Sequence, residues 1–555
     1  MYVGVSPRTR RAALTAPTRR AAANASTRRA AVAALAAVVA VVALLLASCS
    51  VGPSRRPPVA VRGDGMTGPP PTSAAPAPAD PNSLPLPQQQ NPVLDYADCT
   101  ADTVEAVAAE GYPLPPGRAL TASCGQLAVP ADPGRPTAGS TRLGVLRVSA
   151  PDAPRNRPAL VVLGDSGGGG SARVAARLAT LVSDAVLRQY QLVGLDRRGT
   201  GSDLLDCAPP AARAGITDTA PVTGDAGLSA LLEQARSVVQ DCYLQLDQTI
   251  TTYRTASTVA DLERLRTQLR VDRLNIVALG DGGTAAAAWA AAHPQSVGRI
   301  VIDSPLDPST DEPERSERRA GAAEAAFDAF ASSCLARGGC PLGADPRAAV
   351  TQIVRGLDAR PLASADGDRV TAGGAIAAMR AGLGEPARWP ALAAALAGAG
   401  SGDPNGLIGF LSPVLRDGGT FDGALAVTCN DSVRRLAPPE VAQLATRWGQ
   451  QYPLFGAAAA EGLLACGPWP VSGGSPSVTP LPGTTPPVLV LGTAADLRAP
   501  LDGSKKVAQL LGHASFATWE GSAQGAYPRN ACITALADQV LVQGQMPRDG
   551  TVCPA

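Results

Sequence analysis

Residues 274–284, LNIVALGDGGT, run from a short apolar stretch through a glycine turn into an alanine-rich segment. This order is typical of a buried strand that turns sharply into a helix, the setting in which the pattern G-x-S-x-G presents a catalytic serine. Here the serine position of the pattern is Asp281, and its first glycine position is Leu279. An aspartate at this place can act as a nucleophile, or it can cap the helix by accepting backbone N–H bonds near the positive end of the helix dipole. We favour the cap, because those bonds make the carboxylate a poorer nucleophile.

General bases are scarce in this chain. It holds two histidines, His293 and His513, whereas hydrolysis through a covalent intermediate needs a base such as histidine to accept a proton. Ligands of open α/β sheets bind at the carboxyl ends of the strands. His513 precedes the apolar run 516–519, and His293 follows the helix after the glycine turn. We therefore expect both histidines at the opposite end of the sheet.

A glycine-rich loop, residues 164–171, holds the one hydroxyl group expected near Asp281, that of Ser166. This hydroxyl is a candidate nucleophile or ligand donor, but we favour an ordinary turn residue among glycines. The loop lacks the Lys-Ser/Thr ending of a phosphate loop. Asp165, Asp281 and Asp496 offer the oxygen ligands that divalent cations prefer, although their spacing is unspecific and Asp496 has an alternative partner in the Gln524 amide. We predict no metal and no cofactor.

Alternating apolar and helical segments must position these side chains. Helical stretches such as 257–269 and 285–292 separate most of the apolar runs, which favours βαβ units and a mostly parallel sheet. From residue 303 to about 482 the strand pattern gives way to alanine-rich helical segments, which predict a helical cap inserted before the last two strands. The apolar runs are 143–148, 159–163, 192–195, 274–279, 299–302, 488–491 and 516–519.

The N-terminus predicts export. Arginines between positions 8 and 29 precede an apolar run from 30 to 47 that ends in Leu-Ala-Ser-Cys. A basic region, an apolar core and small residues define a secretory signal, and the last four residues match a bacterial lipobox in which Cys49 is acylated. The alternative is an uncleaved membrane anchor, since the run approaches the span of a bilayer. Both readings place the protein at the outer face of the cell membrane.

We expect five segments along the chain. The region after Cys49 is rich in Pro, Ala and Gly, so it cannot bury enough apolar surface to fold. The segments are a signal peptide with lipobox (1–49), a disordered tether (50–94), the first part of an α/β core (95–305), a helical cap (306–482) and the rest of the core (483–555).

Charge and cysteine content narrow the function classes. A formal net charge of +1 gives no electrostatic case for nucleic acid as a partner. Ten cysteines remain besides Cys49, an even number that favours disulfides in an exported chain. We expect sequential pairing, because each neighbouring pair closes a local loop: Cys99–Cys124, Cys207–Cys242, Cys334–Cys340, Cys429–Cys466 and Cys532–Cys553.

Four stretches give the chain a resemblance to a known family. LVGLDRRGTGSDLLDC (192–207) is similar to a strand and loop ending in D-x-R-G-x-G-x-S. LNIVALGDGGT and HPQSVGRIVIDSPLDP (293–308) are similar to an elbow, its helix and the next strand. PVLVLGTAADLRAPLDGS (487–504) and WEGSAQGAYPRNAC (519–532) resemble the loops of a catalytic acid and a catalytic histidine. From Cys99 to Cys553 the chain thus resembles the tripeptidyl-aminopeptidase-like branch of the α/β-hydrolases, relatives of the prolyl aminopeptidases.

The resemblance implies a role for each matching position. It places the acid at Asp496, the nucleophile at Asp281, the histidine at Gln524, and the oxyanion donors around Ser166, Gly167 and Gly282. Glutamine has no group that titrates near neutral pH, so it cannot replace the base. The segment Asn430-Asp431 resembles a family segment near the substrate.

The resemblance therefore predicts an α/β-hydrolase with a helical cap whose catalytic triad is degenerate. We expect an inactive homologue, anchored by lipid, that binds a peptide or another small ligand. One alternative is an active exported exopeptidase or esterase with a non-standard nucleophile such as Ser166. Another is a structural envelope protein whose crevice is filled by side chains.

Overall fold

The computed structural model describes residues 83–218, 224–416, 418–471 and 473–555. The predicted signal segment, the lipidation site Cys49 and most of the predicted tether lie outside the described residues. Among the helices that are described, none is both long and apolar enough to span a bilayer.

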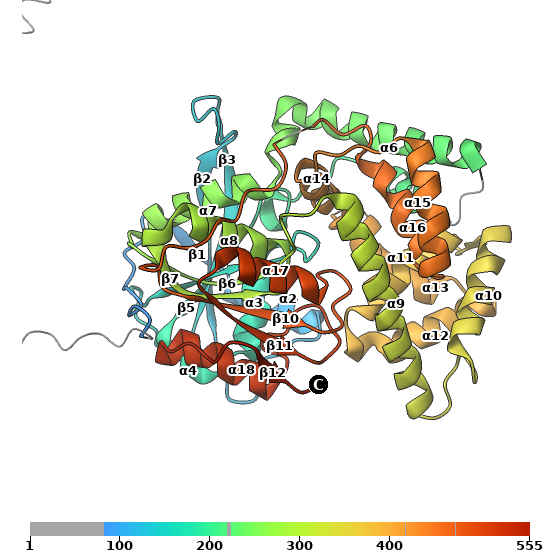
Figure 1. Cartoon of the computed structure of the whole chain (residues 1–555). Coiled ribbons are helices and arrows are strands. Elements are labelled where there is room, and N and C mark those ends of the chain that lie inside the picture. The colour runs from blue at the N-terminus through green and yellow to red at the C-terminus, as the bar shows by residue number, and fades with distance from the viewer. Residues whose placement is uncertain (1–82, 219–223, 417, 472) are drawn as a thin grey trace, which may run out of the picture. The chain divides into compact units, whose positions relative to one another are not determined.

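A ten-stranded sheet runs through the described chain in the order β1-β2-β3-β5-β4-β6-β7-β10-β11-β12 (Figure 1). Neighbouring strands are parallel from β5 to β12, and β1, β2 and β3 continue the sheet antiparallel beside β5. The predicted α/β fold with a mostly parallel sheet is confirmed. The strands are β1 (Tyr96–Asp98), β2 (Thr121–Pro130), β3 (Ser140–Ser149), β4 (Ala159–Leu163), β5 (Gln191–Leu195), β6 (Leu274–Leu279), β7 (Val297–Asp303), β10 (Val488–Thr493), β11 (Ala514–Trp519) and β12 (Thr551–Cys553).

Helices cover both faces of the sheet (Figure 1). The central strands are buried on both faces, and their side chains alternate between the two layers as the strand repeat requires. In β4, Val161 and Leu163 join one apolar cluster, and Leu160 and Val162 join the other. The first cluster includes residues of α7 (Thr255–Leu269), α8 (Asp281–Ala292) and α17 (Leu501–Leu511), and the second those of α2 (Thr100–Ala109), α3 (Ser171–Leu181), α4 (Asp184–Gln189) and α18 (Ala531–Asp538).

The order of the strands reverses beside β4. The chain moves from β4 to β5 on one side, then crosses to β6 on the other side and continues to β7. Such a switch point opens a crevice at the carboxyl ends of the two flanking strands, where ligands of open α/β sheets bind.

A separate helical layer stands beside the sheet and has an apolar core of its own (Figure 1). The short strands β8 (Leu362–Ala363) and β9 (Arg369–Val370) form a hairpin within it. Its helices are α9 (Glu312–Ala336), α10 (Pro346–Ala359), α11 (Ala372–Leu383), α12 (Trp389–Gly400), α13 (Asn405–Leu415), α14 (Phe421–Asn430), α15 (Pro438–Gln451), α16 (Gly456–Glu461) and the short turns η4 (Pro386–Arg388) and η5 (Gly462–Cys466).

Two helices from the first part of the chain also belong to this layer by their packing. Buried residues of α5 (Pro210–Thr217) and α6 (Gly224–Leu246) share apolar clusters with α14, α15 and η5. A cap boundary at residue 306 therefore omits them, because their apolar stripes face the cap rather than the sheet. The remaining short turns are η1 (Gly201–Asp203), η2 (Asp247–Thr252), η3 (Pro294–Ser296) and η6 (Gln539–Gln543).

The folded part begins before residue 95, which corrects the predicted end of the tether. Leu84 is buried and its N–H donates to Gly544 O at 2.7 Å. The Gln90 side chain is also buried and donates to Gln191 Oε1 at 3.0 Å and to Arg157 O at 2.8 Å. Few apolar residues are needed here, because hydrogen bonds to the core hold the segment.

Five disulfides join cysteines that are neighbours along the chain, as sequential pairing requires. Two of them stabilise the helical layer at its junction with the core, Cys207–Cys242 and Cys429–Cys466. The other three are Cys99–Cys124, Cys334–Cys340 and Cys532–Cys553.

Candidate functional site

Most of the predicted site residues follow the carboxyl ends of parallel strands. Asp165 and Ser166 follow β4, Asp281 follows β6, Asp496 follows β10 and Gln524 follows β11. Because those strand ends meet at the switch-point edge of the sheet, segments far apart in the sequence converge there.

The strained residue of the turn after β6 is Gly280. Its φ of 62° and ψ of −131° lie in a region that side chains avoid, whereas Asp281 is already the first residue of α8. In the G-x-S-x-G turn, strain at the nucleophile is what exposes its side chain. The backbone geometry thus favours Gly280 as the nucleophile position, one residue before the predicted Asp281.

The space above Gly280 is filled by a side chain from the neighbouring loop. A Cβ atom on Gly280 would lie 2.3 Å from Asp165 Oδ2. Asp165 is itself buried and is held by Arg498, whose Nη2 lies 2.7 Å from Asp165 Oδ1. The Asp165 carboxylate thus stands where a nucleophilic side chain would begin.

Asp281 forms a second buried ion pair beside the first. Its Oδ1 lies 2.5 Å from Nη1 of Arg197 and accepts the N–H of Ser166 at 2.8 Å. Burial raises the pKa of Asp165, the Arg498 guanidinium lowers it, and the neighbouring Asp281 carboxylate raises it again. Two carboxylates and two guanidinium groups therefore form a neutral, closed network at the turn.

The expected oxyanion donors are already taken by this network. With Gly280 as the nucleophile position, the donor after it is the N–H of Asp281, which faces Asp165 Oδ2 at 3.4 Å. The loop donors are also used, since Ser166 N–H bonds Asp281 and Gly167 N–H bonds Asp165 Oδ1 at 3.0 Å. Gly282, predicted as a donor, instead allows close contact, because a Cβ there would lie 2.5 Å from Gly164 O.

The predicted acid is occupied by the backbone. Asp496 is fully buried, and its Oδ1 accepts the N–H groups of Arg498 and Ala499 at 2.9 Å each. Its Oδ2 accepts the N–H of Gly525 at 3.0 Å. Burial raises the pKa of Asp496 although these bonds oppose the rise. Asp496 does not form the expected bond to the Gln524 amide, because three backbone N–H groups already occupy its carboxylate oxygens.

Gln524 links the core to the cap instead. Its side-chain Oε1 faces Arg498 Nη1 at 3.5 Å, and its N–H donates to Gly384 O, just after α11, at 3.0 Å. The glutamine therefore stands beside a cation and offers no proton acceptor to a nucleophile.

The remaining hydroxyl and imidazole candidates do not complete a catalytic pair. Within the described part of the chain, the Ser166 hydroxyl bonds neither a carboxylate nor an imidazole. His293 ends α8 and lies 3.9 Å from Glu263, and His513 precedes β11. Arg197 and Arg498 already neutralise Asp281 and Asp165, so these carboxylates lack the free charge that a divalent cation would need.

Asn430 and Asp431 hold the cap to the core. Asp431 accepts the N–H and hydroxyl of Thr255, the first residue of α7, at 3.0 and 2.5 Å. Asn430 donates to Ile250 O and Tyr253 O at 2.8 and 3.0 Å. Burial raises the pKa of Asp431 to about 6. These bonds give both residues a structural role, and their role near a ligand stays a prediction.

Sequence reasoning missed the two arginines of the network. Arg197 lies within the quoted stretch 192–207, so the position itself was visible in the sequence. Arg498 also lies within a quoted stretch, 487–504, but nothing in that stretch indicates that the fold brings it beside Asp165.

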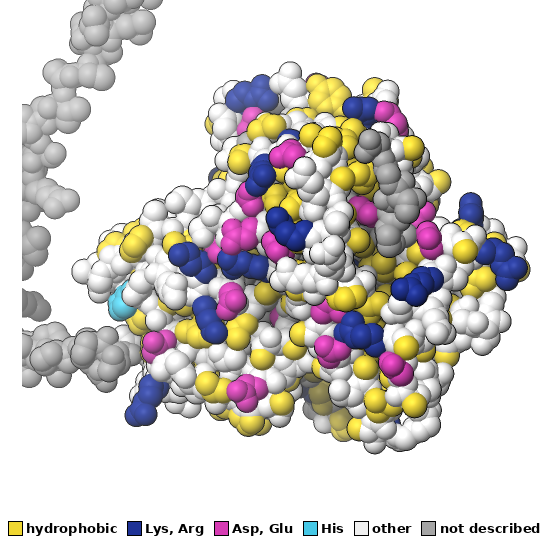
Figure 2. Space-filling model, turned by 45° about the vertical axis from the view of Figure 1, so that its right-hand side comes forward, with side chains coloured by type: hydrophobic (Ala, Val, Ile, Leu, Met, Phe, Trp, Pro, Cys, Tyr) yellow, Lys and Arg dark blue, Asp and Glu magenta, His cyan; other side chains and the backbone are white. Residues whose placement is uncertain are grey.

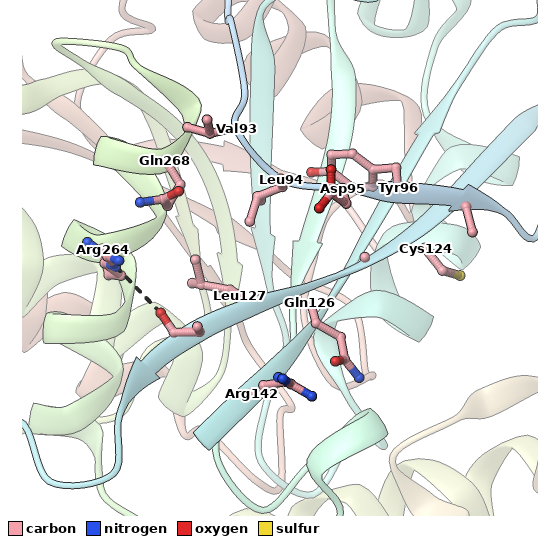
Figure 3. Close-up of a pocket in the computed structure, with 13 residues that line it drawn as sticks. Val93, Leu94, Asp95, Tyr96, Cys124, Gln126, Leu127, Arg142, Arg264 and Gln268 are labelled. Carbon is pink, nitrogen blue, oxygen red and sulfur yellow. Dashed lines mark hydrogen bonds between the residues drawn. The ribbon is translucent and has the colours of Figure 1, made fainter. Parts of the chain in front are cut away.

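A larger hollow lies elsewhere, at the antiparallel edge of the sheet (Figure 3). It measures about 530 Å³ between β1, β2 and α7, and none of the predicted site residues lines it. Arg264 from α7 reaches across to Ala128 O at 3.5 Å there. The face seen in Figure 2 mixes basic and acidic side chains without a large patch of one sign.

Comparisons with known proteins show that the chain is similar to hydrolases and peptidases. Residues 452–553 match the family model described as TAP-like protein. Over 465 residues the chain is 26% identical to serine protease Hip1 of Mycobacterium tuberculosis, covering 79% of this chain and 88% of that protein. Over 480 residues it is 25% identical to tripeptidyl aminopeptidase of Streptomyces lividans, covering 83% and 87%. A solved proline iminopeptidase of Mycobacterium smegmatis superposes with a TM-score of 0.33 at 14% identity, covering 76% of this chain and 98% of that one. The predicted resemblance to tripeptidyl-aminopeptidase-like α/β-hydrolases is confirmed.

Proposed function

Since the chain is a relative of the tripeptidyl-aminopeptidase-like α/β-hydrolases, we propose that it is a catalytically inactive member that binds a peptide or another small ligand. One observation carries the proposal: the Asp165 carboxylate occupies the space above Gly280, the position at which the family pattern has its nucleophile. A glycine has no nucleophilic atom, and its place cannot accept a side chain while Asp165 is there.

Two further features of the site support inactivity. The N–H groups that would stabilise an oxyanion already bond carboxylates of the protein itself. A negative charge that develops nearby would meet two resident carboxylates, which works against the transition state of acyl transfer. Gln524 supplies no base at the third position of the triad.

Binding is favoured over a purely structural role because the cap keeps polar and charged groups at its junction with the crevice. Arg318, Arg319 and Arg498 line a small gap between the cap and the loop after β10. A scaffold without a ligand would gain stability by filling such a junction with apolar side chains.

Steady-state hydrolysis tests the proposal. The full chain in detergent, assayed with tripeptidyl p-nitroanilides and p-nitrophenyl esters, should show no turnover above the uncatalysed rate. The Streptomyces lividans tripeptidyl aminopeptidase serves as the active control. Turnover that disappears in a Ser166→Ala variant would overturn the proposal and favour the alternative of an active exopeptidase or esterase.

A restored triad gives a second, independent readout. The variant Gly280→Ser/Asp165→Gly/Gln524→His opens the space above the turn and supplies a serine and a base. We expect measurable esterase activity from it, because removal of the Asp165 carboxylate frees the N–H groups of Gly167 and Asp281 and Asp496 is retained. The matched control Gly280→Ala/Asp165→Gly/Gln524→His should remain inactive.

We also propose that the protein is exported and anchored by lipid at Cys49. Five disulfides support an oxidising compartment. A Cys49→Ala variant should lose incorporation of labelled palmitate in a bacterial host that processes lipoproteins. Equal incorporation in the variant and the parent chain would contradict this assignment.

A further inference from the structure

The helical layer encloses a hollow of about 210 Å³ between α9, α11, α14, α16 and η5. This volume is below the range of roughly 300–1,000 Å³ that is usual for drug-sized ligands. Any occupant is therefore small. The polar and charged lining comes mainly from α9 and α11, namely Glu312, Ser316, Arg319 and Arg380, and apolar residues of α14 and η5 form much of the opposite wall.

The one carboxylate of this lining is already fully used. Glu312 pairs with Arg319 and lies 3.1 Å from Nε of Arg315. It also accepts the hydroxyl of Ser316 at 3.3 Å. Glu312 thus balances at most one of the cations around it.

Arg380, in the last turn of α11, is the cation of this lining that Glu312 does not pair with. Within the described part of the chain its guanidinium forms neither an ion pair nor a hydrogen bond, and the side chain, which lines the hollow, is exposed. The protein packed around it, together with the nearby Arg319 and Arg498 guanidiniums, lowers the pKa of Arg380 to about 10. The side chain is still protonated at neutral pH, so it adds a positive charge without a protein partner to the lining of the hollow.

The lining holds two guanidinium groups, those of Arg319 and Arg380, and one carboxylate, that of Glu312, so its net charge is positive. A positively charged hollow attracts anions, and guanidinium groups bind carboxylates in a planar, bidentate way. The apolar wall, formed in part by Phe421, Leu425 and Leu463, suits a short aliphatic side chain.

We propose that this hollow binds the carboxylate of a small aliphatic ligand through Arg380 and Arg319. The proposal rests on the binding function proposed above and names the chemical class of its ligand. The carboxylate belongs either to the C-terminus of a short peptide or to a free organic acid.

The hollow adjoins the degenerate site. Arg319 lines it on one side and, on the other, the gap that also contains Arg498. Gly384, one turn after Arg380, accepts the N–H of Gln524 at 3.0 Å. A bound carboxylate would therefore place the rest of a peptide toward the crevice that the cap covers.

Calorimetric titration of the full chain at low ionic strength tests this assignment. The probes are acetyl-Ala-Leu, N-acetyl-leucine, 4-methylpentanoate and, as a neutral match in size, N-acetyl-leucinamide. We expect a carboxylate to bind at least tenfold more tightly than the amide, and Arg380→Met to remove that preference. Arg355→Met, which removes an exposed arginine on α10 outside the hollow, should leave it unchanged.

The probes separate the two sources of the carboxylate. Preference for acetyl-Ala-Leu or N-acetyl-leucine indicates a peptide end, and preference for 4-methylpentanoate indicates a free acid. Equal binding of the amide, failure of every carboxylate to bind up to about 10 mM, or equal losses in the Arg380 and Arg355 variants would overturn the assignment. Absent hydrolysis in the same preparations would leave the inactive-homologue proposal standing, so the two failures are distinguishable.

Discussion

Asp165 has a structural place at the glycine turn. It follows β4 in the loop where the family has an oxyanion segment, and its carboxylate reaches over Gly280 to meet the N–H of Asp281. Arg498 and Arg197 neutralise the two neighbouring carboxylates. Removing the buried Arg197 is expected to cost several kcal/mol, since the Asp281 charge is left uncompensated. In the inactive homologue that we propose, these ion pairs take the place of a nucleophile.

Asp431 should make stability depend on pH. Burial raises its pKa from 3.8 to about 6, so the folded state retains a proton that the unfolded state has released. The free energy of unfolding should fall as pH rises from about 4 to above 6, by at most about 3 kcal/mol from this group.

The variant Asp431→Asn isolates this contribution. Its amide can still accept the Thr255 N–H and donate to the Thr255 hydroxyl, but it does not titrate. Thermal unfolding from pH 4 to 7.5 should show a smaller decline for the variant than for the parent chain. Parallel curves for the two proteins would rule out the role assigned to Asp431.

Helix α14 is anchored to the core through its first turn. Asp422 is buried and accepts the backbone N–H groups of Cys207 and Ala208 at 2.7 and 2.9 Å. Arg213 of α5 meets the same carboxylate through two nitrogens at 2.9 Å each. This contact joins the loop after β5, α5 and the cap, and so fixes the cap over the strand ends.

Asp422→Ala should destabilise the protein by about 2–4 kcal/mol, because two buried backbone donors lose their acceptor and the Arg213 guanidinium loses its buried counter-charge, although Asp206 still pairs with it. Asp328→Ala provides the control. It breaks an exposed pair with Arg347 on the cap and should change stability by less than about 1 kcal/mol. The thermal midpoints of both variants give the comparison, and equal shifts would contradict the anchoring role.

Across the whole molecule, apolar runs made the parallel strands predictable. β4 and β6 are buried on both faces and have the bounds that their sequences indicate. β2 escaped prediction because only Ala122, Leu127 and Val129 are buried in it and small or polar residues make up most of the rest. Its sequence therefore carries little of the apolar signal that marks a strand, and its pairing with β3 shows that it is one.

The sequence alone does not decide which residue of the glycine turn holds the nucleophile position. Glycines stand on both sides of Asp281, so the sequence fits a nucleophile position at residue 280 or 281, and only the backbone dihedral angles decide. Likewise, no sequence pattern indicates the neighbours of Arg498 and Arg380, because the fold alone determines which residues lie beside them.

Fluorophosphonate labelling of the full chain tests the central claim most directly. The probe reacts with activated serines, and peptide mass spectrometry locates any adduct. We predict no labelled serine under conditions in which the Streptomyces lividans tripeptidyl aminopeptidase is labelled to completion. Labelling of one defined serine, such as Ser166, that disappears on heat denaturation would contradict the claim that the site is closed by Asp165 and catalytically inactive.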